Sequence, residues 1–253
     1  ATENLIIASC LAVGRTILKN CAIEPEIKDL TNFLTKAGAK IKWTGKRRVQ
    51  IDGVKSLNEI SYNIMGDRIE CGTFCVAATL TAGDLNIKGF NPKLIITELN
   101  MLRKIGARII TKKNQIFIKG TKNLKNLKNV ITKEYPGFST DLQAQFMVLL
   151  CKAKGRSIIK ENIFENRYLH CAELRRLGAN IIVRNKRAII LGGANFEGAE
   201  LMSSDLRASV ALVLAAIAAK GKSIIHRIYH LSRGYENLDK KLKKIGVNIK
   251  KIS

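Results

Sequence analysis

The chain is 253 residues long, 46% of them hydrophobic, and contains only three prolines. This composition excludes a disordered or collagen-like protein and provides for one large or two modest domains with hydrophobic cores. The longest apolar run, Ala208 to Ala219, is shorter than the roughly 18 to 20 residues of a membrane-spanning helix, so no membrane partner is expected.

The net charge of +24 comes from 44 lysines and arginines against 20 acidic residues. A charge of this size is typical of nucleic-acid-binding proteins. Here, however, the basic residues are spread along the whole chain between apolar positions, and only 6% of the residues are aromatic. This pattern favours the solvated faces of amphipathic elements, and nucleic acid is not an expected partner.

Six cysteines and three histidines offer little for a metal site. The cysteines form no C-x-x-C pair, and Cys71 with Cys75 on one helix face would supply at most half of a zinc site. We therefore expect buried free thiols, no metal and no cofactor. Free thiols, together with the lack of a recognisable export signal, predict a cytoplasmic protein.

Four segments of the chain align on a glycine and recur every 68 to 72 residues. They are Leu30–Ile41, Glu98–Ile109, His170–Ile181 and Leu238–Ile249, with the glycines at Gly38, Gly106, Gly178 and Gly246. A leucine four positions before each glycine and an apolar residue one position before it form one stripe of a helix, which the glycine ends in the left-handed conformation. Strands are predicted to open at Ile41, Ile109, Ile181 and Ile249, with a second strand in the first three segments that ends at Gly53, Gly120 or Gly192.

A second glycine lies about 24 residues before each of these, at Gly14, Gly83, Gly155 and Gly221. Each is predicted to close a helix of small and apolar residues, which is typical of a buried helix, and to be followed by a strand. The fold is therefore α/β, made of tandem repeats of about 70 residues.

Three of the buried helices are predicted to start with an aspartate, at Asp67, Asp141 and Asp205. An aspartate at this position usually caps free backbone N–H groups, which is the simplest interpretation for all three. In the first repeat the equivalent residue would precede Ala1. The chain is therefore predicted to begin inside a repeat and to be a piece of a larger enzyme.

Three arginines lie where strands or loops lead into helices. Arg207 falls in a first helical turn, where a cation opposes the helix dipole and is better explained by an anion that it binds. Arg167 and Arg233 lie in loops at equivalent places of two repeats. The three could converge on a phosphate or a carboxylate, and surface salt bridges are the alternative.

Several short strings match one family in order and with nearly fixed spacing. They are Glu24-Pro25-Glu26-Ile27, Asp67-Arg68-Ile69-Glu70 with Gly72-Thr73-Phe74, Thr140-Asp141-Leu142-Gln143-Ala144-Gln145-Phe146, Phe164-Glu165-Asn166-Arg167, Asp205-Leu206-Arg207-Ala208-Ser209 and Arg233-Gly234-Tyr235-Glu236. In these strings the chain resembles the UDP-N-acetylglucosamine enolpyruvyl transferases (1-carboxyvinyltransferases), which carry out the first committed step of bacterial peptidoglycan synthesis.

The resemblance implies an inside-out α/β barrel fold with six repeats in two domains, of which this chain would be about the last three-fifths. Residues 1–65 would form the last repeat of the first domain and residues 66–253 the second domain of three repeats. Most of the substrate cleft would lie between the two domains.

The implied reaction moves the enolpyruvyl group of phosphoenolpyruvate onto the 3-hydroxyl of UDP-N-acetylglucosamine and releases phosphate. The resemblance places the base, or the hydrogen-bond partner of the hydroxyl, at Asp141, and a main-chain contact to the sugar nucleotide at Ile163. Arg207 and Arg233 would hold the anionic groups of phosphoenolpyruvate. Arg167 would belong to the same cluster, and Asp205 would steer it.

The flexible loop that carries the family's catalytic cysteine precedes the point that matches Ala1. None of the six cysteines lies in the context of that loop, so none inherits its role. We expect the chain to be inactive without the missing N-terminal segment, which would be its partner. The shikimate-pathway enolpyruvyl transferase is the nearest rival, although the strings at Gln143–Gln145 and Arg233–Glu236 favour the amino-sugar enzyme. A non-catalytic basic remnant is the rival from another class.

Overall fold

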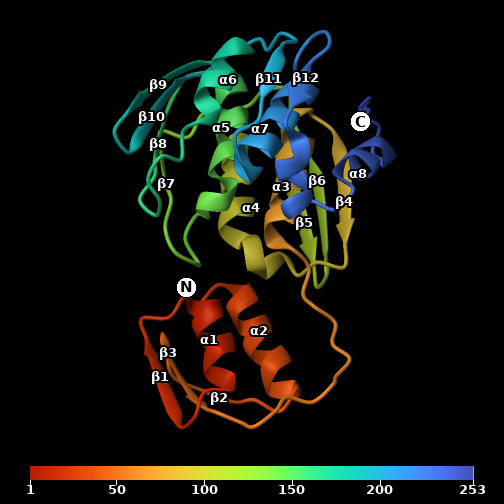
Figure 1. Ribbon diagram of the computed structural model, residues 1–253. Coiled ribbons are helices and arrows are strands. Elements are labelled where there is room, and N and C mark those ends of the chain that lie inside the picture. The colour runs from red at the N-terminus through yellow and green to blue at the C-terminus, as the bar shows by residue number, and fades with distance from the viewer. Residues whose placement is uncertain (253) are drawn as a thin grey trace. The chain divides into compact units, whose positions relative to one another are not determined.

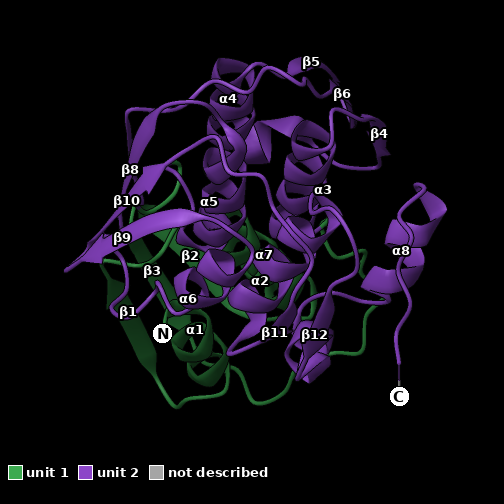
Figure 2. Ribbon diagram, turned by 90° about the horizontal axis from the view of Figure 1, so that it is seen from above, with its two compact units in different colours: residues 1–66, 134–136 green, residues 67–133, 137–253 purple. Residues whose placement is uncertain are grey.

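A computed structural model describes residues 1–252 of the chain, which divides into two compact units. Unit 1 comprises residues 1–66 and 134–136, and unit 2 comprises residues 67–133 and 137–253 (Figure 2). The short segment 134–136 thus belongs to unit 1, although it lies within the range that the sequence assigns to the second domain. Within residues 1–252, no helix has the length and apolar character needed to cross a bilayer.

Unit 1 contains one α/β repeat (Figure 1). Its elements are α1 (Thr2–Cys10), β1 (Arg15–Lys19), α2 (Pro25–Lys36), β2 (Lys40–Gly45) and β3 (Arg48–Asp52). The strands pair antiparallel in the order β1-β3-β2, so the last strand of the repeat lies in the middle of its sheet. The core of the unit contains Ile6 of α1 and Val49 and Ile51 of β3, all fully buried, together with apolar residues of α2.

Unit 2 contains the other helices and strands, including three short 3-10 helices labelled η. In chain order they are α3 (Arg68–Leu80), β4 (Asp84–Lys88), η1 (Pro92–Ile95), α4 (Ile96–Ile105), β5 (Arg108–Lys112), β6 (Gln115–Lys119), β7 (Asn129–Ile131), η2 (Thr140–Leu142), α5 (Gln143–Lys152), β8 (Arg156–Lys160), α6 (His170–Arg176), β9 (Asn180–Arg184), β10 (Arg187–Leu191), β11 (Glu200–Met202), α7 (Leu206–Ile217), β12 (Ile224–His226), η3 (Ile228–Arg233) and α8 (Leu238–Lys244).

The sheets of unit 2 repeat the pattern of unit 1 and extend it. The strand orders are β4-β6-β5, β7-β8-β10-β9 and β11-β12. Strand β7 adds parallel to β8, and β11 adds parallel to β12, so that α5 and α7 become crossover helices between parallel strands. Strand β7 thus connects the second repeat to the third, and β11 connects the third to the fourth. The sequence did not predict them.

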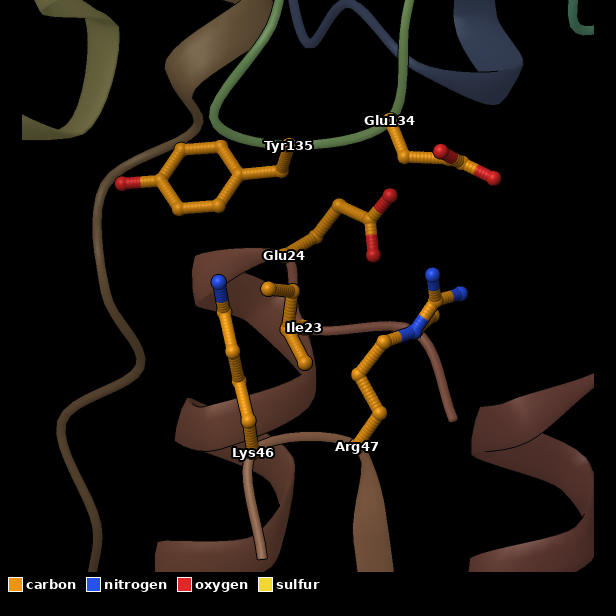
Figure 3. Close-up of a pocket in the computed structure, with 7 residues that line it drawn as sticks. Ile23, Glu24, Lys46, Arg47, Glu134 and Tyr135 are labelled. Carbon is orange, nitrogen blue, oxygen red and sulfur yellow. The ribbon is translucent and has the colours of Figure 1, made fainter. Parts of the chain in front are cut away.

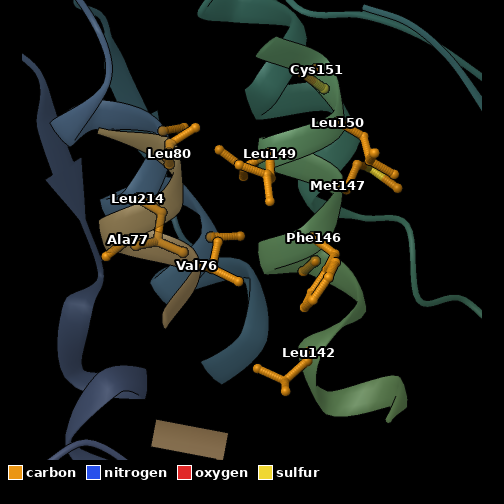
Figure 4. Packing of buried hydrophobic residues seen from close by; sticks show 14 of the residues in the cluster. Val76, Ala77, Leu80, Leu142, Phe146, Met147, Leu149, Leu150, Cys151 and Leu214 are labelled. Atoms are coloured by element: carbon orange, nitrogen blue, oxygen red, sulfur yellow. The ribbon is translucent and has the colours of Figure 1, made fainter. Parts of the chain in front are cut away.

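Helices α3, α5 and α7 pack against one another in the interior of unit 2, with the strands around them (Figure 2). Their apolar side chains form the main core, where Phe146 and Met147 of α5 are fully buried (Figure 4). The sequence predicts that these helices are made of small and apolar residues. They are buried because each packs against the equivalent helices of the other repeats in unit 2, with helices in the interior and strands outside, which is the inside-out arrangement.

In the first three repeats, the glycine at the end of the second strand contacts the glycine that follows the buried helix. The N–H of Gly192 donates to the carbonyl oxygen of Gly155 at 2.9 Å, and the same bond joins the equivalent glycines of the two preceding repeats. A Cβ atom at Gly192 would overlap the backbone carbonyl oxygen of Ala153 at the end of α5. Glycine is therefore required where the returning strand passes the end of the buried helix, since no side chain fits there.

Two expectations need correction. No strand forms at Ile249, because none of the strands in residues 1–252 pairs with that segment and an isolated strand is not stable. Asp141 does not cap α5. It lies inside η2, and Leu142 occupies the N-cap position of α5 without a side-chain cap.

Candidate active site

The first turns of α3, α5 and α7 lie together in unit 2 and bring distant parts of the sequence to one place. Gln145 of α5 donates through Nε2 to Thr73 Oγ1 of α3 at 3.2 Å and to the carbonyl oxygen of Asp141 at 3.0 Å. Arg207 of α7 donates through Nε to Asp141 Oδ1 at 2.5 Å. Positive helix ends that converge in this way favour the binding of anions.

Asp141 directs its carboxylate towards two arginines and not towards the backbone of its own helix. Besides the contact to Arg207, its Oδ1 lies 3.6 Å from Nη1 of Arg167. The capping role that the aspartate would have had falls to Ser139, whose Oγ accepts the N–H of Asp141 at 3.2 Å. The side chain of Asp141 remains 30% exposed. A partly exposed carboxylate between two guanidinium groups can accept a proton from a hydroxyl and can also be displaced from its arginines by another anion.

Arg167 is the more buried of the two arginines. Burial lowers the pKa of its guanidinium, and the like charge of Arg207 acts in the same direction, whereas Asp141, Glu161 and Asp205 oppose the shift. Its guanidinium also lies over the ring of Phe164, 4.3 Å from the ring centre. Two like charges held this close in a partly buried place are stabilised when an anion binds between them.

Asp205 serves as the N-cap of α7. Its Oδ1 accepts the N–H groups of Arg207 at 2.9 Å and of Ala208 at 3.1 Å, and Ser204 Oγ donates to its Oδ2 at 3.0 Å. Burial acts to raise the pKa of Asp205, but these donors outweigh burial and the pKa is lowered. The carboxylate therefore fixes the start of the helix that carries Arg207. Asp67 caps α3 in the same way, as predicted.

Arg233, the third predicted arginine, stands apart from this ion-pair cluster. It ends η3, is exposed, and forms no ion pair with the described residues 1–252. The two residues that follow Arg233 are nevertheless held in place, one by close packing and the other by a hydrogen bond. Gly234 lies so close to Leu206 that a Cβ there would stand 2.8 Å from Leu206 Cδ2. The buried Tyr235 shares a 2.8 Å hydrogen bond between its hydroxyl and Thr73 Oγ1.

Ile163 lies in the loop that leads from β8 to Arg167. Its N–H donates to Glu161 Oε1 at 2.8 Å, so its carbonyl oxygen is the main-chain group left to contact a ligand. The sequence patterns assigned no role to Glu161, the first residue of this loop. The polar network of Gln145, Thr73 and Tyr235 was also missed, because its members are far apart in sequence. Their only shared signal is that each lies in a string that carries the family resemblance.

Unit 1 has a hollow of its own, with a volume of about 190 Å³ (Figure 3). The lining residues are Ala22, Ile23, Glu24, Lys46, Arg47, Glu134 and Tyr135. The side chains of Glu24, Lys46 and Arg47 point into it, and the buried Oε2 of Glu24 has no hydrogen-bond partner within residues 1–252. None of the predicted catalytic or substrate-binding residues lines this hollow.

The cysteines have the character that the sequence predicted. All six are free and buried. Burial raises the pKa of the thiols of Cys151 and Cys171, the latter to about 12, so neither is an activated nucleophile. No cluster of metal-ligating side chains occurs in the described part of the chain.

Comparison with known proteins places this fold in one class. The family model described as EPSP synthase (3-phosphoshikimate 1-carboxyvinyltransferase) matches residues 1–242, and the chain belongs to that family. The enolpyruvyl transferase NikO from Streptomyces tendae has a similar structure, with a TM-score of 0.86 and 26% identity, over 97% of this chain and 58% of that one. EPSP synthase from Acinetobacter baumannii, with a TM-score of 0.72 and 18% identity over 97% of this chain and 60% of that one, shares the fold. The predicted fold class is confirmed.

The curated relatives carry a more specific name than the family model. The chain is similar to the UDP-N-acetylglucosamine 1-carboxyvinyltransferases of Pelagibacter ubique (strain HTCC1062), at 62% identity over the whole chain, and of Endomicrobium trichonymphae, at 49% over 99% of the chain. The relative from Rickettsia akari (strain Hartford) is 47% identical over the whole chain. The chain spans 60% of the length of each of these relatives.

Proposed function

We propose that this chain forms the part of a UDP-N-acetylglucosamine 1-carboxyvinyltransferase that carries the base and the anion-binding arginines. The observation that supports this most directly is Asp141 held between Arg167 and Arg207 at the first turns of the buried helices. The identity of 62% to a relative of that name supports the choice of acceptor.

The geometry suggests how the reaction would proceed. The oxygen of the sugar 3-hydroxyl forms a bond to C2 of phosphoenolpyruvate, Asp141 accepts the hydroxyl proton, and the methylene carbon takes up a proton. Loss of a proton from that carbon, with cleavage of the bond between C2 and the phosphate oxygen, then releases phosphate. Arg167 and Arg207 would exchange their contacts to Asp141 for contacts to the substrate anions, which gain charge-assisted hydrogen bonds as phosphate leaves. No residue of this chain is assigned as the acid.

Helix α1 supports the proposal that the chain acts together with further repeats. It has the apolar composition of α3, α5 and α7, which are buried, yet Leu5 and Ile7, and Leu11 at its C-cap, are 50% to 56% exposed. Three large apolar residues on and next to one short helix are unusual on a free surface. Sister helices from an additional α/β segment would cover them, as α5 and α7 cover α3. We therefore propose that the 253-residue chain alone does not turn over.

The proposal is tested by measuring phosphate release from phosphoenolpyruvate. The chain is assayed alone and after mixing with the part of the Pelagibacter ubique relative that it does not match, with UDP-N-acetylglucosamine or 3-phosphoshikimate as acceptor. Turnover only in the mixture, and only with the amino-sugar nucleotide, is expected. Turnover with 3-phosphoshikimate would instead support a shikimate-pathway enolpyruvyl transferase, the activity that the description of the family model names. Nucleic-acid affinity that falls steeply with salt, without turnover, would support a basic binding module.

A further inference from the structure

Glu161 is a buried carboxylate to which the proposed reaction assigns no step. It directly follows β8 and is 1% exposed. Its Oε1 accepts the hydroxyl of Thr132 at 2.8 Å and the N–H groups of Ile163 at 2.8 Å and Phe164 at 3.2 Å. Its Oε2 accepts the hydroxyl of Thr140 at 3.0 Å. Three of the four donors thus meet at Oε1 and the fourth at Oε2, so both oxygens of the carboxylate are engaged.

The donors come from three separate segments of unit 2. Thr132 follows β7, Thr140 immediately precedes Asp141, and Ile163 lies in the loop that ends at Arg167. One side chain therefore joins the segment that carries Asp141 to the segment that carries Arg167. The side chains of Asp141 and Arg167 face each other at 3.6 Å, a separation that depends on both segments keeping their places.

Glu161 is itself firmly fixed. Its backbone N–H donates to the carbonyl oxygen of Lys186 at 2.9 Å, in the turn that leads into β10. The neighbouring N–H of Asn162 donates to Thr132 Oγ1 at 2.9 Å, and Thr132 is fully buried. The carboxylate thus connects the sheet to both loops through hydrogen bonds.

We propose that Glu161 is a positioning residue, which holds Asp141 and Arg167 in mutual register through Thr140 and through the N–H groups of Ile163 and Phe164. It forms no hydrogen bond or ion pair with either of the two side chains, and it positions them through the loops that carry them. By engaging the N–H of Ile163, it also leaves the carbonyl oxygen of that residue as the available main-chain group. The inference deepens the proposed function and takes from it only the roles of Asp141 and Arg167.

Backbone amide exchange, measured by NMR on the 253-residue chain, tests the positioning directly. In Glu161→Ala, exchange at Ile163 and Phe164 is expected to rise at least tenfold, whereas the amides of β10 keep their rates. Glu161→Gln is expected to stay within threefold of the wild type, because its oxygen still accepts both N–H groups and its amide can donate to Thr140 Oγ1. Unchanged exchange at Ile163 and Phe164 in Glu161→Ala, or an equal rise throughout β10, would overturn the inference.

A matched pair of variants keeps the inference testable if Glu161→Ala does not fold. Thr140→Val and Thr132→Val each remove one hydroxyl donor to Glu161 with little change in shape. Only Thr140→Val cuts the link to the catalytic segment, so it should raise amide exchange at Asp141 at least tenfold, and Thr132→Val should not. Equal effects of the two variants at Asp141 would contradict the assignment.

The kinetic measurement uses the completed mixture, which is this chain together with the part of the Pelagibacter ubique relative that it does not match. Glu161→Ala is expected to raise KM for phosphoenolpyruvate at least tenfold, and Glu161→Gln is expected to restore it to within threefold of the wild type. An unchanged KM in Glu161→Ala would contradict the positioning role. If the wild-type mixture shows no turnover, the proposed function fails, but amide exchange still decides whether Glu161 orders the two loops.

Discussion

His170 is expected to make the stability of unit 2 sensitive to mild acid. It opens α6, is almost fully buried, and its Nε2 finds no hydrogen-bond partner within residues 1–252. Burial lowers the pKa of its imidazole from 6.5 to about 4, and the negative charge of Asp205 opposes that shift only in part. The folded protein therefore holds a neutral imidazole at a pH where the unfolded chain already binds a proton.

The magnitude follows from the two pKa values. Above pH 6.5 both states are neutral and His170 contributes no pH dependence. As the pH falls from 6.5 towards 4 the unfolded state binds the proton first, so the free energy of unfolding decreases. At about 1.4 kcal/mol per pH unit, the loss reaches about 2.5 kcal/mol at pH 4.5. That loss is a large part of the 5 to 15 kcal/mol that is roughly typical for a whole domain.

Urea unfolding of the wild type and of His170→Phe between pH 7.5 and pH 4.5 measures this effect. Far-UV circular dichroism is the appropriate signal, because the single tryptophan, Trp43, lies in unit 1. Other groups that titrate in this range, such as the buried Glu98 with its raised pKa, are common to both proteins and cancel in the difference. The stability of the variant relative to the wild type should increase by about 2.5 kcal/mol on acidification. A difference that does not depend on pH would refute the reasoning.

Three further predictions concern packing, the buried polar network and the thiols. Gly192→Ala should lower the free energy of unfolding by about 3 kcal/mol or more in a urea titration, because its Cβ meets the backbone of Ala153, whereas Gly45→Ala, which has room, should change it by less than about 1 kcal/mol. Equal losses would contradict the close approach. Tyr235→Phe should lower the melting temperature by an amount that corresponds to about 1 to 2 kcal/mol, since it removes one of the two hydrogen-bond partners of Thr73, and an unchanged melting temperature would show that the bond is dispensable. A thiol reagent should label none of the six buried cysteines quickly in native buffer and all six in denaturant, and rapid native labelling would contradict their burial.

Local sequence signals predicted the repeat well where the structure depends on neighbours in the chain. The glycines at Gly38, Gly106 and Gly178 do end helices in the left-handed conformation, and strands follow each of them. The cap at Asp67 was predicted for the same reason, since a cap involves residues two or three positions away. Such features require no knowledge of the tertiary structure.

The parts that were missed depend on contacts between distant residues. Asp141 leaves the capping role because Arg207, 66 positions away, offers its carboxylate a stronger partner. Strand β7 pairs with β8, and its own three residues, although they include Val130 and Ile131, are too few to show the alternation of a strand. The donors to Glu161 are as much as 29 positions away from it, so no periodicity connects them. A sequence motif indicates which residues are functional, whereas the tertiary packing determines the contacts that each of them makes.

The central claim is that Asp141 accepts the hydroxyl proton in enolpyruvyl transfer. The most direct measurement is kcat for phosphate release by the completed mixture, with UDP-N-acetylglucosamine as acceptor, for Asp141→Asn and for the control Asp84→Asn. The control alters a surface pair, in which Asp84 lies 3.4 Å from Lys119 and is 67% exposed. We predict that Asp141→Asn lowers kcat by about 10²- to 10⁴-fold, as expected for loss of a general base, while Asp84→Asn stays within about twofold of the wild type. Turnover of Asp141→Asn at the wild-type rate would contradict the account.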